Sequence, residues 1–378
     1  MNRYQEVDVL GGRFISEFGM EAYPHLSTLK NVVTDSSQHY PGSMAMDAHN
    51  KAAGHQRRLG IYLSENFRTG PSMGAVTTPG SELALFTHLT QVTQAETMRY
   101  AYKYWRRTWR TEHRHCGGVL VWQLNDCWPT VSWAVVDYHL VRKPGFYAIA
   151  RALRPIDVGV ARTVHDWTQT SDYVDQMSKL KTGQVDHTLP ARKGTFDVWI
   201  ASSKVEAVEA HVTVRFISVR SGKDVQPSIT QTITAAANTS TDVLASQALP
   251  PSIPNPEELV TTPFSVAKYD PYVIHATVSI GGQLVATDTA WPEPIKYLDF
   301  PDRDVAFEVS PAGDRLTVAA TKPVKGFVME EMVGLKLSDN GFDLMPGEKQ
   351  EVKVEGCLKA GELKYTYIGA PGPSLTIN

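Results

Sequence analysis

Two short apolar runs stand out in the first 153 residues. Residues 13–18 read RFISEF, and residues 119–124 read VLVWQL. Each run is too short for a helix and has polar residues at or just after its end, Glu17 in the first run and Asn125-Asp126 after the second, which is typical of buried strands. Segments with helical spacing separate the two runs, so this part of the chain predicts strands that alternate with helices. That alternation indicates parallel βα units.

Three helices are expected around these strands. Residues 43–68 are rich in Ala, Met and charged residues, and they predict a helix with a break near Gly54 or Gly60. Residues 81–109 repeat large apolar side chains mainly at steps of three and four, which predicts one long helix. A third helix is expected over residues 145–153, directly after a proline.

Beyond Arg154 the hydrophobic period changes to two. Apolar and polar residues alternate in short segments, and turns rich in Gly, Ser and Asp separate them, which predicts antiparallel β-sandwiches. We expect residues 235–262, which are rich in Ala, Ser, Thr and Pro, to form a long excursion within the first sandwich. The clearest alternating segments are 212–216, 272–280, 305–309, 315–320 and 351–356.

Prolines between residues 292 and 302 predict a junction that divides the β-rich region in two. The sequence pattern therefore predicts three domains. An α/β domain is expected over residues 1–153, a β-sandwich over residues 154–297 and a C-terminal β-sandwich over residues 298–378. The length of 378 residues agrees with two or three domains at about 150 residues each.

Composition excludes a disordered, a collagen-like or a coiled-coil chain. Hydrophobic residues make up 42% and charged residues 20% of the chain, which is ordinary globular usage, and the formal net charge is −3. That balance gives no electrostatic reason to expect a nucleic acid or a membrane as partner. The 8 Trp and 15 Tyr suit a sugar or another flat-faced ligand, and equally suit packing within β-sandwiches.

The three cysteines do not form a disulfide framework. Cys116 and Cys127 flank a predicted strand, which places them too far apart to bond. A sparse, odd set of cysteines favours the cell interior, whereas the sequon at Asn238 favours secretion, so the location stays undetermined. Histidine spacings match no zinc motif and no glycine-rich loop follows a strand, so we expect neither a metal nor a cofactor.

Glu17 is the strongest candidate for catalysis. It lies at the end of the run at 13–18, and the carboxyl ends of strands carry the chemistry in α/β barrels. A period of two would put Ile15 and Glu17 on one face, so that Glu17 projects into a barrel mouth. An ordinary glutamate at a strand end explains the pattern equally well.

The second candidate site follows the run at 119–124, where residues 122–129 read WQLNDCWP. Sugars present apolar C–H faces and polar edges, and an indole ring beside amide and carboxylate groups suits both. Trp122, Asn125 and Asp126 are therefore candidate sugar ligands. For Trp128, a place in the core of the domain explains the pattern better.

These two segments together resemble the catalytic half of the β-mannosidases of glycoside hydrolase family 2. RFISEFGMEAYP (13–24) is followed about a hundred residues later by GVLVWQLNDCWP (118–129). Residues 142–155 resemble the last barrel helix of that family. Residues 337–348 resemble the closing β-sandwich of its mannosidase and exo-glucosaminidase branches. The resemblance therefore runs along essentially the whole chain.

The resemblance implies specific roles for the candidate residues. Glu17 matches the nucleophile of a retaining hydrolase at the end of the seventh barrel strand. Trp122 matches the floor of the sugar subsite at the end of the eighth strand, and its peptide bond to Gln123 is expected to be cis. Asn125 and Asp126 would bind sugar hydroxyls or anchor the loop, and Asp126 is also placed to cap the turn that follows.

One part of the catalytic machinery is absent from the sequence. Retaining cleavage needs a second carboxyl group about 5–5.5 Å from the nucleophile as acid/base. In the family this is the glutamate of an Asn-Glu pair well upstream of the nucleophile, whereas here 16 residues precede Glu17 and no Asn-Glu dipeptide occurs. We expect a C-terminal fragment that is inactive alone.

The fold that the resemblance implies is multidomain. Residues 1–153 would form a partial (β/α)8 barrel with about the last two of its eight βα units. Two immunoglobulin-like β-sandwich modules would follow. Two strands cannot close a barrel, so their open edges and apolar faces are expected to be exposed.

Three functions stay open on the sequence. The first is an exo-acting β-mannosidase that removes terminal non-reducing β-D-mannose from an oligosaccharide or glycan. The second changes the sugar, to that of an exo-β-glucosaminidase, a β-galactosidase or a β-glucuronidase, and the motif at 122–126 favours mannose or glucosamine. The third is a non-catalytic β-sandwich fragment with a remnant of a barrel. The oligomeric state is not predicted.

Overall fold

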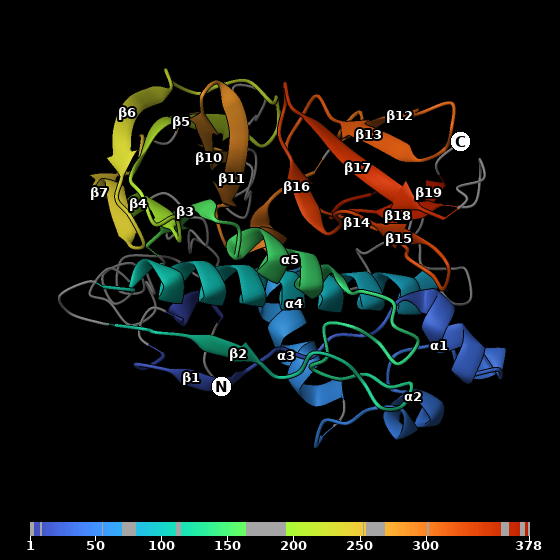
Figure 1. Cartoon of the computed structure of the whole chain (residues 1–378). Helices are drawn as coiled ribbons and strands as arrows, with labels where there is room; N and C mark the ends of the chain where they lie inside the picture. The colour runs from blue at the N-terminus through green and yellow to red at the C-terminus, as the bar shows by residue number, and fades with distance from the viewer. Residues whose placement is uncertain are drawn as a thin grey trace, which may run out of the picture. The chain divides into compact units, whose positions relative to one another are not determined.

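The chain divides into two compact units in the computed structural model (Figure 1). Unit 1 joins residues 1–154, called here the α/β part, with residues 302–378, called the C-terminal sandwich. Unit 2 contains residues 155–301. The structure describes residues 4–7, 10–54, 56–69, 81–110, 115–163, 194–251, 253–254, 269–300, 302–356, 363–370 and 375–376.

The α/β part contains a two-stranded parallel sheet and the helices that accompany it, as the sequence predicts. Figure 1 shows the long helix α4 between the strand pair and the short helix α5. The strands are β1 (Ile15–Phe18) and β2 (Val119–Val121). The helices are α1 (Leu26–Val32), α2 (Met44–Ala48), α3 (Gln56–Asn66), α4 (Ser81–Arg107) and α5 (Pro144–Ala152), with 3-10 turns at Tyr4–Glu6 and Ser36–Gln38.

The predicted helices are confirmed with one refinement. The segment 43–68 contains two helices, α2 and α3, and the break lies around Gly54, whose φ of +85° favours glycine. Gly60 lies inside α3 and does not break it. Cys116 and Cys127 are both free thiols, as expected, and Cys357 lies outside the described residues.

The two strands pack on α4 through their apolar side chains. Phe18 and Val119 contact a buried cluster that includes Ala101 and Trp105 of α4. The rings of Phe18 and Trp105 meet edge to face, with their centroids 4.7 Å apart. Such aromatic pairs contribute about 0.5–1.5 kcal/mol beyond the burial of their area. The sheet is therefore held from its helix side.

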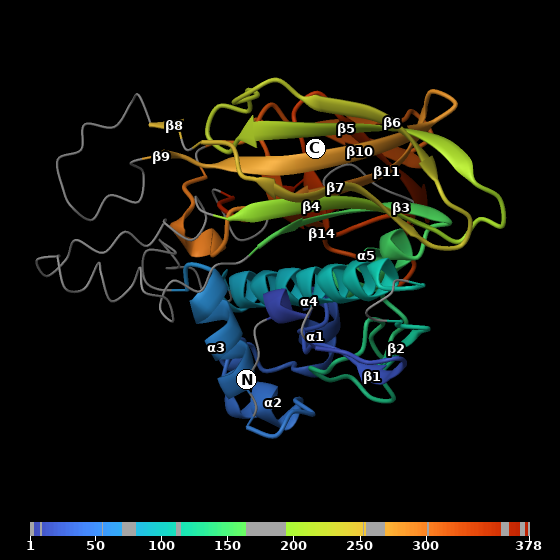
Figure 2. The same cartoon turned by 90° about the vertical axis from the view of Figure 1, so that its left-hand side faces the viewer.

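Unit 2 is a β-sandwich of two antiparallel sheets, which Figure 2 shows as two layers. One sheet has the order β11-β10-β5-β6 and the other has the order β3-β4-β7. The strands are β3 (Ile156–Arg162), β4 (Thr195–Ser202), β5 (Val208–Ser218), β6 (Ile229–Ala235), β7 (Ser240–Ala248), β10 (Tyr272–Ile280) and β11 (Gln283–Ala290), with a short pair β8 (Ile253–Pro254) and β9 (Tyr269–Asp270).

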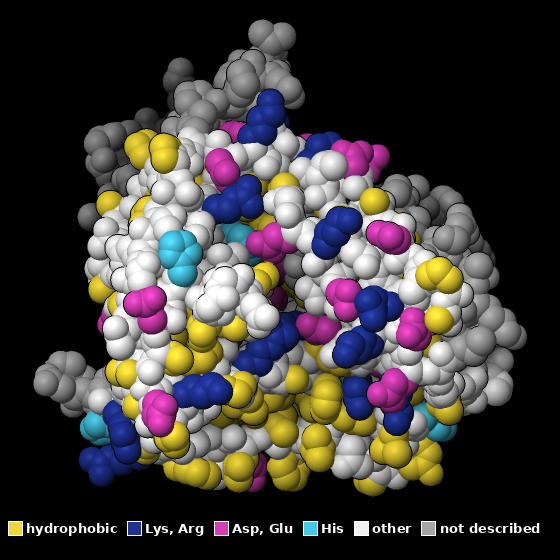
Figure 3. Space-filling model, turned by 45° about the horizontal axis from the view of Figure 1, so that its top comes forward, with side chains coloured by type: hydrophobic (Ala, Val, Ile, Leu, Met, Phe, Trp, Pro, Cys, Tyr) yellow, Lys and Arg dark blue, Asp and Glu magenta, His cyan; other side chains and the backbone are white. Residues whose placement is uncertain are grey.

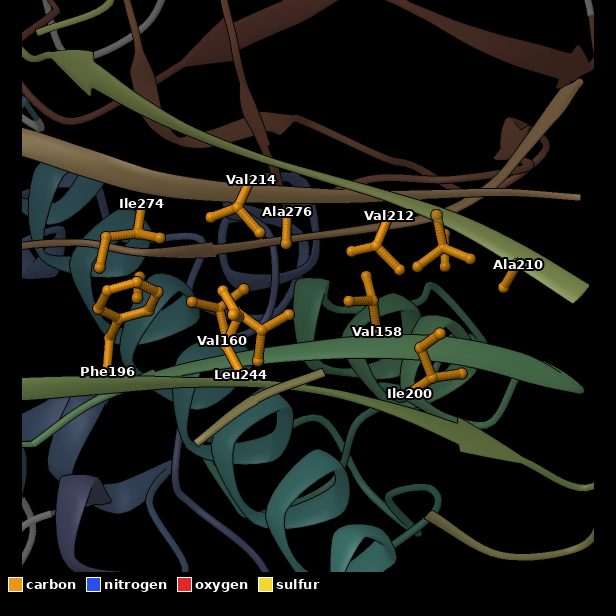
Figure 4. Packing of buried hydrophobic residues seen from close by; sticks show 14 of the residues in the cluster. Val158, Val160, Phe196, Ile200, Ala210, Val212, Val214, Leu244, Ile274 and Ala276 are labelled. Carbon is orange, nitrogen blue, oxygen red and sulfur yellow. The ribbon is translucent and has the colours of Figure 1, made fainter. Parts of the chain in front are cut away.

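The core of unit 2 comes from the inward residues of both sheets. Figure 4 shows Val158 and Ile200 of one sheet pointing toward Val212 and Val214 of the other. Strict alternation places every second residue of β5 in this core, as the period of two predicts. Phe216 is fully buried there, and its ring lies against the rings of two further aromatic residues.

The expectation of a long excursion over 235–262 is wrong in its first part. Residues Ser240–Ala248 form strand β7, which pairs with β4. Only Leu244 of this strand is buried, because β7 lies at the edge of its sheet and most of its side chains face water. The usual apolar alternation is therefore missing from the sequence. Residues 255–262 lie outside the described residues.

The C-terminal sandwich also has two sheets, with the orders β12-β13-β17-β15 and β16-β14-β18-β19. Its core includes Leu316, Val318, Phe327 and Leu344. The strands are β12 (Ala306–Val309), β13 (Arg315–Ala319), β14 (Val324–Met329), β15 (Lys336–Leu337), β16 (Phe342–Leu344), β17 (Lys349–Glu355), β18 (Lys364–Thr366) and β19 (Leu375–Thr376).

These elements form the predicted fold class, a part of an α/β barrel together with two β-sandwiches. The domain boundaries at residues 153/154 and 297/298 stay predictions. Basic and acidic side chains are interspersed over the face that Figure 3 shows, in keeping with the small net charge. Among the described residues, no helix is both long and apolar enough to cross a membrane.

Candidate active site

The ends of β1 and β2 bring the two predicted site segments together. The strands run parallel, and the Ile15 amide donates to the Gly118 carbonyl at 2.9 Å. The Trp122 amide donates to the Phe18 carbonyl at 2.8 Å, so the ladder continues to the carboxyl end of both strands. Glu17 and Trp122 therefore lie at neighbouring carboxyl ends, the edge that carries chemistry in α/β barrels.

A β-bulge changes the direction of Glu17. Ile15 pairs with Val119 and Phe18 pairs with Val121, so two residues of β1 lie opposite the single residue Leu120. Ile15 and Phe18 consequently both pack toward α4, while Glu17 is exposed. The expectation that Ile15 and Glu17 share one face is wrong, because a bulge inserts one residue and breaks the alternation.

Gly19 allows the two strand ends to touch. A Cβ atom added at Gly19 would lie 1.7 Å from the Trp122 carbonyl oxygen, a distance that no side chain tolerates. Trp122 itself is 49% exposed, and its peptide bond to Gln123 is cis, which confirms that expectation. An exposed indole at the end of one strand and an exposed carboxylate at the end of its neighbour are the groups that a sugar ring needs.

The Glu17 carboxylate receives no hydrogen bond or ion pair from the described residues, and it faces solvent. Exposed apolar side chains accompany it on the same strands and their ends. Phe14, Leu120 and Leu124 are each more than half exposed. This exposure agrees with the expected open sheet. The role of Glu17 as nucleophile stays a prediction.

Asp126 and Asn125 differ in their surroundings. Asp126 is buried, accepts a hydrogen bond from the Ser132 hydroxyl at 2.7 Å and pairs with the Lys51 ammonium at 2.9 Å. Both of its oxygens are used within the protein, which favours its role as a loop anchor over that of a sugar ligand. Asn125 is exposed and donates to the Asp126 carbonyl at 3.2 Å.

Lys143, which sequence reasoning missed, ties the two exit loops together. Its side chain is fully buried, and its ammonium group donates to the carbonyls of Ala22 at 3.0 Å and Ser132 at 3.2 Å. Burial lowers the pKa of Lys143 to about 8, against the raising effect of Asp126. Ala22 follows β1 and Ser132 follows β2, so one cation holds the loops of both candidate segments.

Gln94 of α4 repeats this connection from the helix side. Its buried amide nitrogen donates to the carbonyl of Met20 at 2.8 Å, and to those of Trp133 and Ala134 at 3.3 Å each. A buried amide group is costly unless it is bonded, so these contacts specify the position of both loops. A run of Gln and Thr inside a long helix was the available sequence signal.

Glu21 is a second carboxylate close to the exit of β1. It is 1% exposed, and neither of its oxygens has a hydrogen-bond partner among the described residues. Burial raises its pKa, while the Arg58 guanidinium at 3.6 Å and the charge of Lys143 act in the opposite direction. Within the described ranges, no group of three His, Cys, Asp or Glu residues is arranged to hold a metal ion.

Two family models match the β-rich parts of the chain. The mannosidase Ig/CBM-like domain matches residues 194–297, and the Ig-fold domain of mannosidases matches residues 300–365. Both matches agree with the observed sandwiches. They place the second half of the chain among mannosidase-associated domains.

Curated relatives match nearly the whole chain. Beta-mannosidase B of Aspergillus flavus is 43% identical over 373 residues, and the protein of the same name from Emericella nidulans is 40% identical over 372 residues. Each alignment covers 97% of this chain and 39% of the relative. The chain therefore spans about two fifths of the length of these relatives.

Solved structures show the same fold at low sequence identity. The β-D-mannosidase from Dictyoglomus thermophilum superposes with a TM-score of 0.71 at 20% identity, over 97% of this chain and 38% of that one. The exo-chitosanase of Amycolatopsis orientalis superposes with a TM-score of 0.66 at 13% identity, over 99% and 45%. In sequence and in fold, the chain is similar to a part of these β-mannosidases, in agreement with the resemblance to glycoside hydrolase family 2 that its motifs carry.

Proposed function

We propose that this chain supplies the nucleophile and the sugar platform of a retaining, exo-acting β-mannosidase, which hydrolyses terminal non-reducing β-D-mannose residues. The observation that supports this most is the position of Glu17 beside Trp122 at neighbouring carboxyl ends of parallel strands. Relatives of 40–43% identity that carry the name Beta-mannosidase B support the choice of sugar.

In the proposed reaction, the Glu17 carboxylate attacks the anomeric carbon of the mannoside. The bond from that carbon to the leaving oxygen breaks, and a second carboxyl group donates its proton to this oxygen. Water then loses a proton to the second group and attacks the same carbon, which releases mannose and restores Glu17. The exposed Trp122 indole stacks on the apolar C–H face of the sugar.

We infer that the second carboxyl group comes from outside this chain. In the family it belongs to an Asn-Glu pair, and no such dipeptide occurs in the 378 residues. The chain also spans only 39% of its curated relatives. The chain alone would then bind sugar weakly and would not cleave it. Purified chain should release no nitrophenol from p-nitrophenyl β-mannoside above a Glu17→Ala control.

A chimera tests the positive half of the proposal. The matching segment of the Aspergillus flavus relative is replaced by this chain, which restores the missing length from a protein 43% identical to it. A 2-deoxy-2-fluoro-β-D-mannosyl fluoride should then trap a covalent adduct, and peptide mass spectrometry should find it on Glu17. An adduct on another residue, or full turnover by a Glu17→Gln chimera, would contradict the proposed role.

The exo-β-glucosaminidase is the second candidate function. It is favoured by the fold match to an exo-chitosanase with a TM-score of 0.66. The same chimera should be assayed with p-nitrophenyl β-glucosaminide beside the mannoside. Preference for the glucosaminide would replace the mannosidase proposal. If substitution of Glu17 left the turnover of both substrates unchanged, the non-catalytic fragment would be favoured.

A further inference from the structure

Helix α4 carries buried polar side chains on two opposite sides. Residues 87–98, with the sequence THLTQVTQAETM, are all buried. Gln94 lies on the side that bonds the exit loops of β1 and β2. Glu96 follows two residues later, and residues two apart on a helix point about 200° away from each other. Glu96 therefore serves a different neighbour from Gln94.

That neighbour is strand β14 of the C-terminal sandwich. The Lys325 ammonium group lies 2.8 Å from a Glu96 carboxylate oxygen and 3.1 Å from Asp343 of β16. One helical turn before Glu96 lies Val92, and one turn before that lies His88. The three side chains at four-residue steps form one face of α4, and that face meets β14.

Gly326 shows how close this contact is. The imidazole of His88 donates to the Gly326 carbonyl at 2.8 Å. A Cβ atom added at Gly326 would lie 2.7 Å from a methyl group of Val92, and the φ of Gly326 is +61°. Both the space and the backbone conformation therefore require glycine at this position. The strand lies directly on the helix.

Two further helices make polar contacts with the same module. The Ser27 amide in α1 donates to the Glu330 carboxylate at 3.0 Å. The Tyr147 hydroxyl in α5 donates to the buried Glu331 carboxylate at 2.9 Å, and Arg151 bonds Asp339. Together with α4, three helices of the α/β part are thus bonded to the C-terminal sandwich.

Each part brings an ion pair of its own to this contact, Glu96 with Arg99 and Lys325 with Asp343, and Glu96 and Lys325 join the two pairs. Lys325 is 1% exposed, and a buried cation is costly unless it is paired. Burial raises the pKa of Glu96, but the charges of Arg99 and Lys325 outweigh it and hold the pKa at about 2. A sandwich that folded without α4 would leave Lys325 without the Glu96 carboxylate.

We propose that the C-terminal sandwich is a brace for α4, and that Lys325 is a positioning residue for the site of Glu17 and Trp122. The path runs from Lys325 to Glu96, across α4 to Gln94, and from Gln94 to the two exit loops. The brace stands on the contacts alone, whereas the positioning of a catalytic glutamate rests on the proposed function.

Hydrogen exchange of the whole chain tests the brace without any need for turnover. Lys325→Met should speed exchange about tenfold or more in residues 87–98 and in the exit loop at 19–25. Lys336→Met, at an exposed lysine of the same module, is the matched control and should leave both segments unchanged. Faster exchange confined to residues 302–356 would overturn the proposal.

Glu96→Gln gives the reciprocal test from the helix side, and it keeps the shape of the side chain. It should speed exchange several-fold in β14, because Lys325 then loses the negative charge of Glu96 as a partner. This substitution also serves if Lys325→Met prevents folding. Unchanged exchange in β14 would overturn the brace.

The positioning role has a separate readout in the active chimera. Lys325→Met should lower kcat about tenfold with KM changed less than about twofold, since small shifts of the nucleophile slow the reaction strongly, whereas stacking of the sugar on Trp122 tolerates them. Unchanged kcat beside faster exchange would overturn the positioning role and leave the brace supported. An unsubstituted chimera without turnover would count against the proposed function, and the exchange experiment would still decide on the brace.

Discussion

The two sandwiches of this chain look alike in strand content but differ in what completes them. The sandwich of unit 2 buries Val158, Val212, Phe216 and Ile274 between its own two sheets. The C-terminal sandwich has a comparable core of its own, yet it also buries Lys325 against a helix of the α/β part. The first module is closed by apolar packing, and the second also makes a buried polar contact with α4.

Two modules of similar fold therefore differ in the contacts that they make with the rest of the chain. Contacts group residues 302–378 with residues 1–154, although residues 155–301 separate them in the chain. Buried charged groups need partners, so the module that contains them is tied to the elements that supply those partners. Apolar cores impose no such condition, because any sufficiently large core stabilises its own domain.

The largest expected effect comes from removal of the C-terminal sandwich. A chain that ends at Pro301 leaves Glu96 without Lys325 and exposes the face of α4 that carries Val92. We expect the α/β part to lose cooperative folding while unit 2 keeps it. Hydrogen exchange should show protection in β5 and β10 and none in α4. Protected α4 amides in this truncated chain would contradict the brace.

Phe216→Ala should destabilise unit 2 by about 4 kcal/mol, because it removes a fully buried aromatic side chain from the core. Because α4 and β14 belong to unit 1, their unfolding free energies should change by no more than about 0.5 kcal/mol. Hydrogen exchange measured over a series of denaturant concentrations gives the unfolding free energies of unit 2 and of α4 and β14 together. An equal loss in β14 would show that the two sandwiches unfold together.

Gly326→Ala should destabilise unit 1 by about 3 kcal/mol, since the added Cβ meets Val92 and the positive φ disfavours any side chain. Gly347→Ala is the matched control. Its φ is +85°, but no atom lies within 4 Å of the added Cβ, so it should cost only about 1 kcal/mol. Equal effects of the two substitutions would mean that the contact with α4 contributes nothing.

The smallest expected effect is a pH dependence that belongs to Glu331. Burial raises the pKa of this carboxyl group to about 7, whereas hydrogen bonds from Asn340 and Tyr147 act to lower it. Its folded pKa therefore lies above the ordinary value of 4.5. The neutral form favours folding, so this contribution is complete below about pH 4.5 and is lost as pH rises through about 7.

The measurement compares the chain with its Glu331→Gln variant. Between about pH 4.5 and 8, the stability of unit 1 in the unsubstituted chain should fall by roughly 2 kcal/mol more than in the variant. Unit 2 should show no such difference, because Glu331 belongs to unit 1. Identical pH profiles of unit 1 in the two proteins would show that Glu331 does not cause the pH dependence of its stability.

The sequence predicted the elements that repeat a simple pattern. Alternation revealed β5 and β10, and the three- and four-residue steps revealed α4. The edge strand β7 was missed because only Leu244 among its residues is buried. The bulge at Ser16 and Glu17 was missed because a two-against-one pairing leaves no mark in so short a strand.

The candidate site was predicted in part. The neighbouring positions of Glu17 and Trp122 followed from the two motifs and the parallel pairing of their strands. The supporting residues Gln94 and Lys143 were not predicted, because a polar residue reads as solvent-exposed unless its burial is known. Lys325, in the middle of a strand, also reads as solvent-exposed, since its burial depends on a helix more than 200 residues away in the sequence.

The most direct test of the central claim is native-state hydrogen exchange of the whole chain across a urea series. The amides of α4 and β14 should share one opening free energy and one dependence on urea, while those of β5 and β10 follow another. That result would establish the α/β part and the C-terminal sandwich as one cooperative unit. If α4 and β14 instead opened with different free energies and different urea dependences, the C-terminal sandwich would be an independent domain and the account would be wrong.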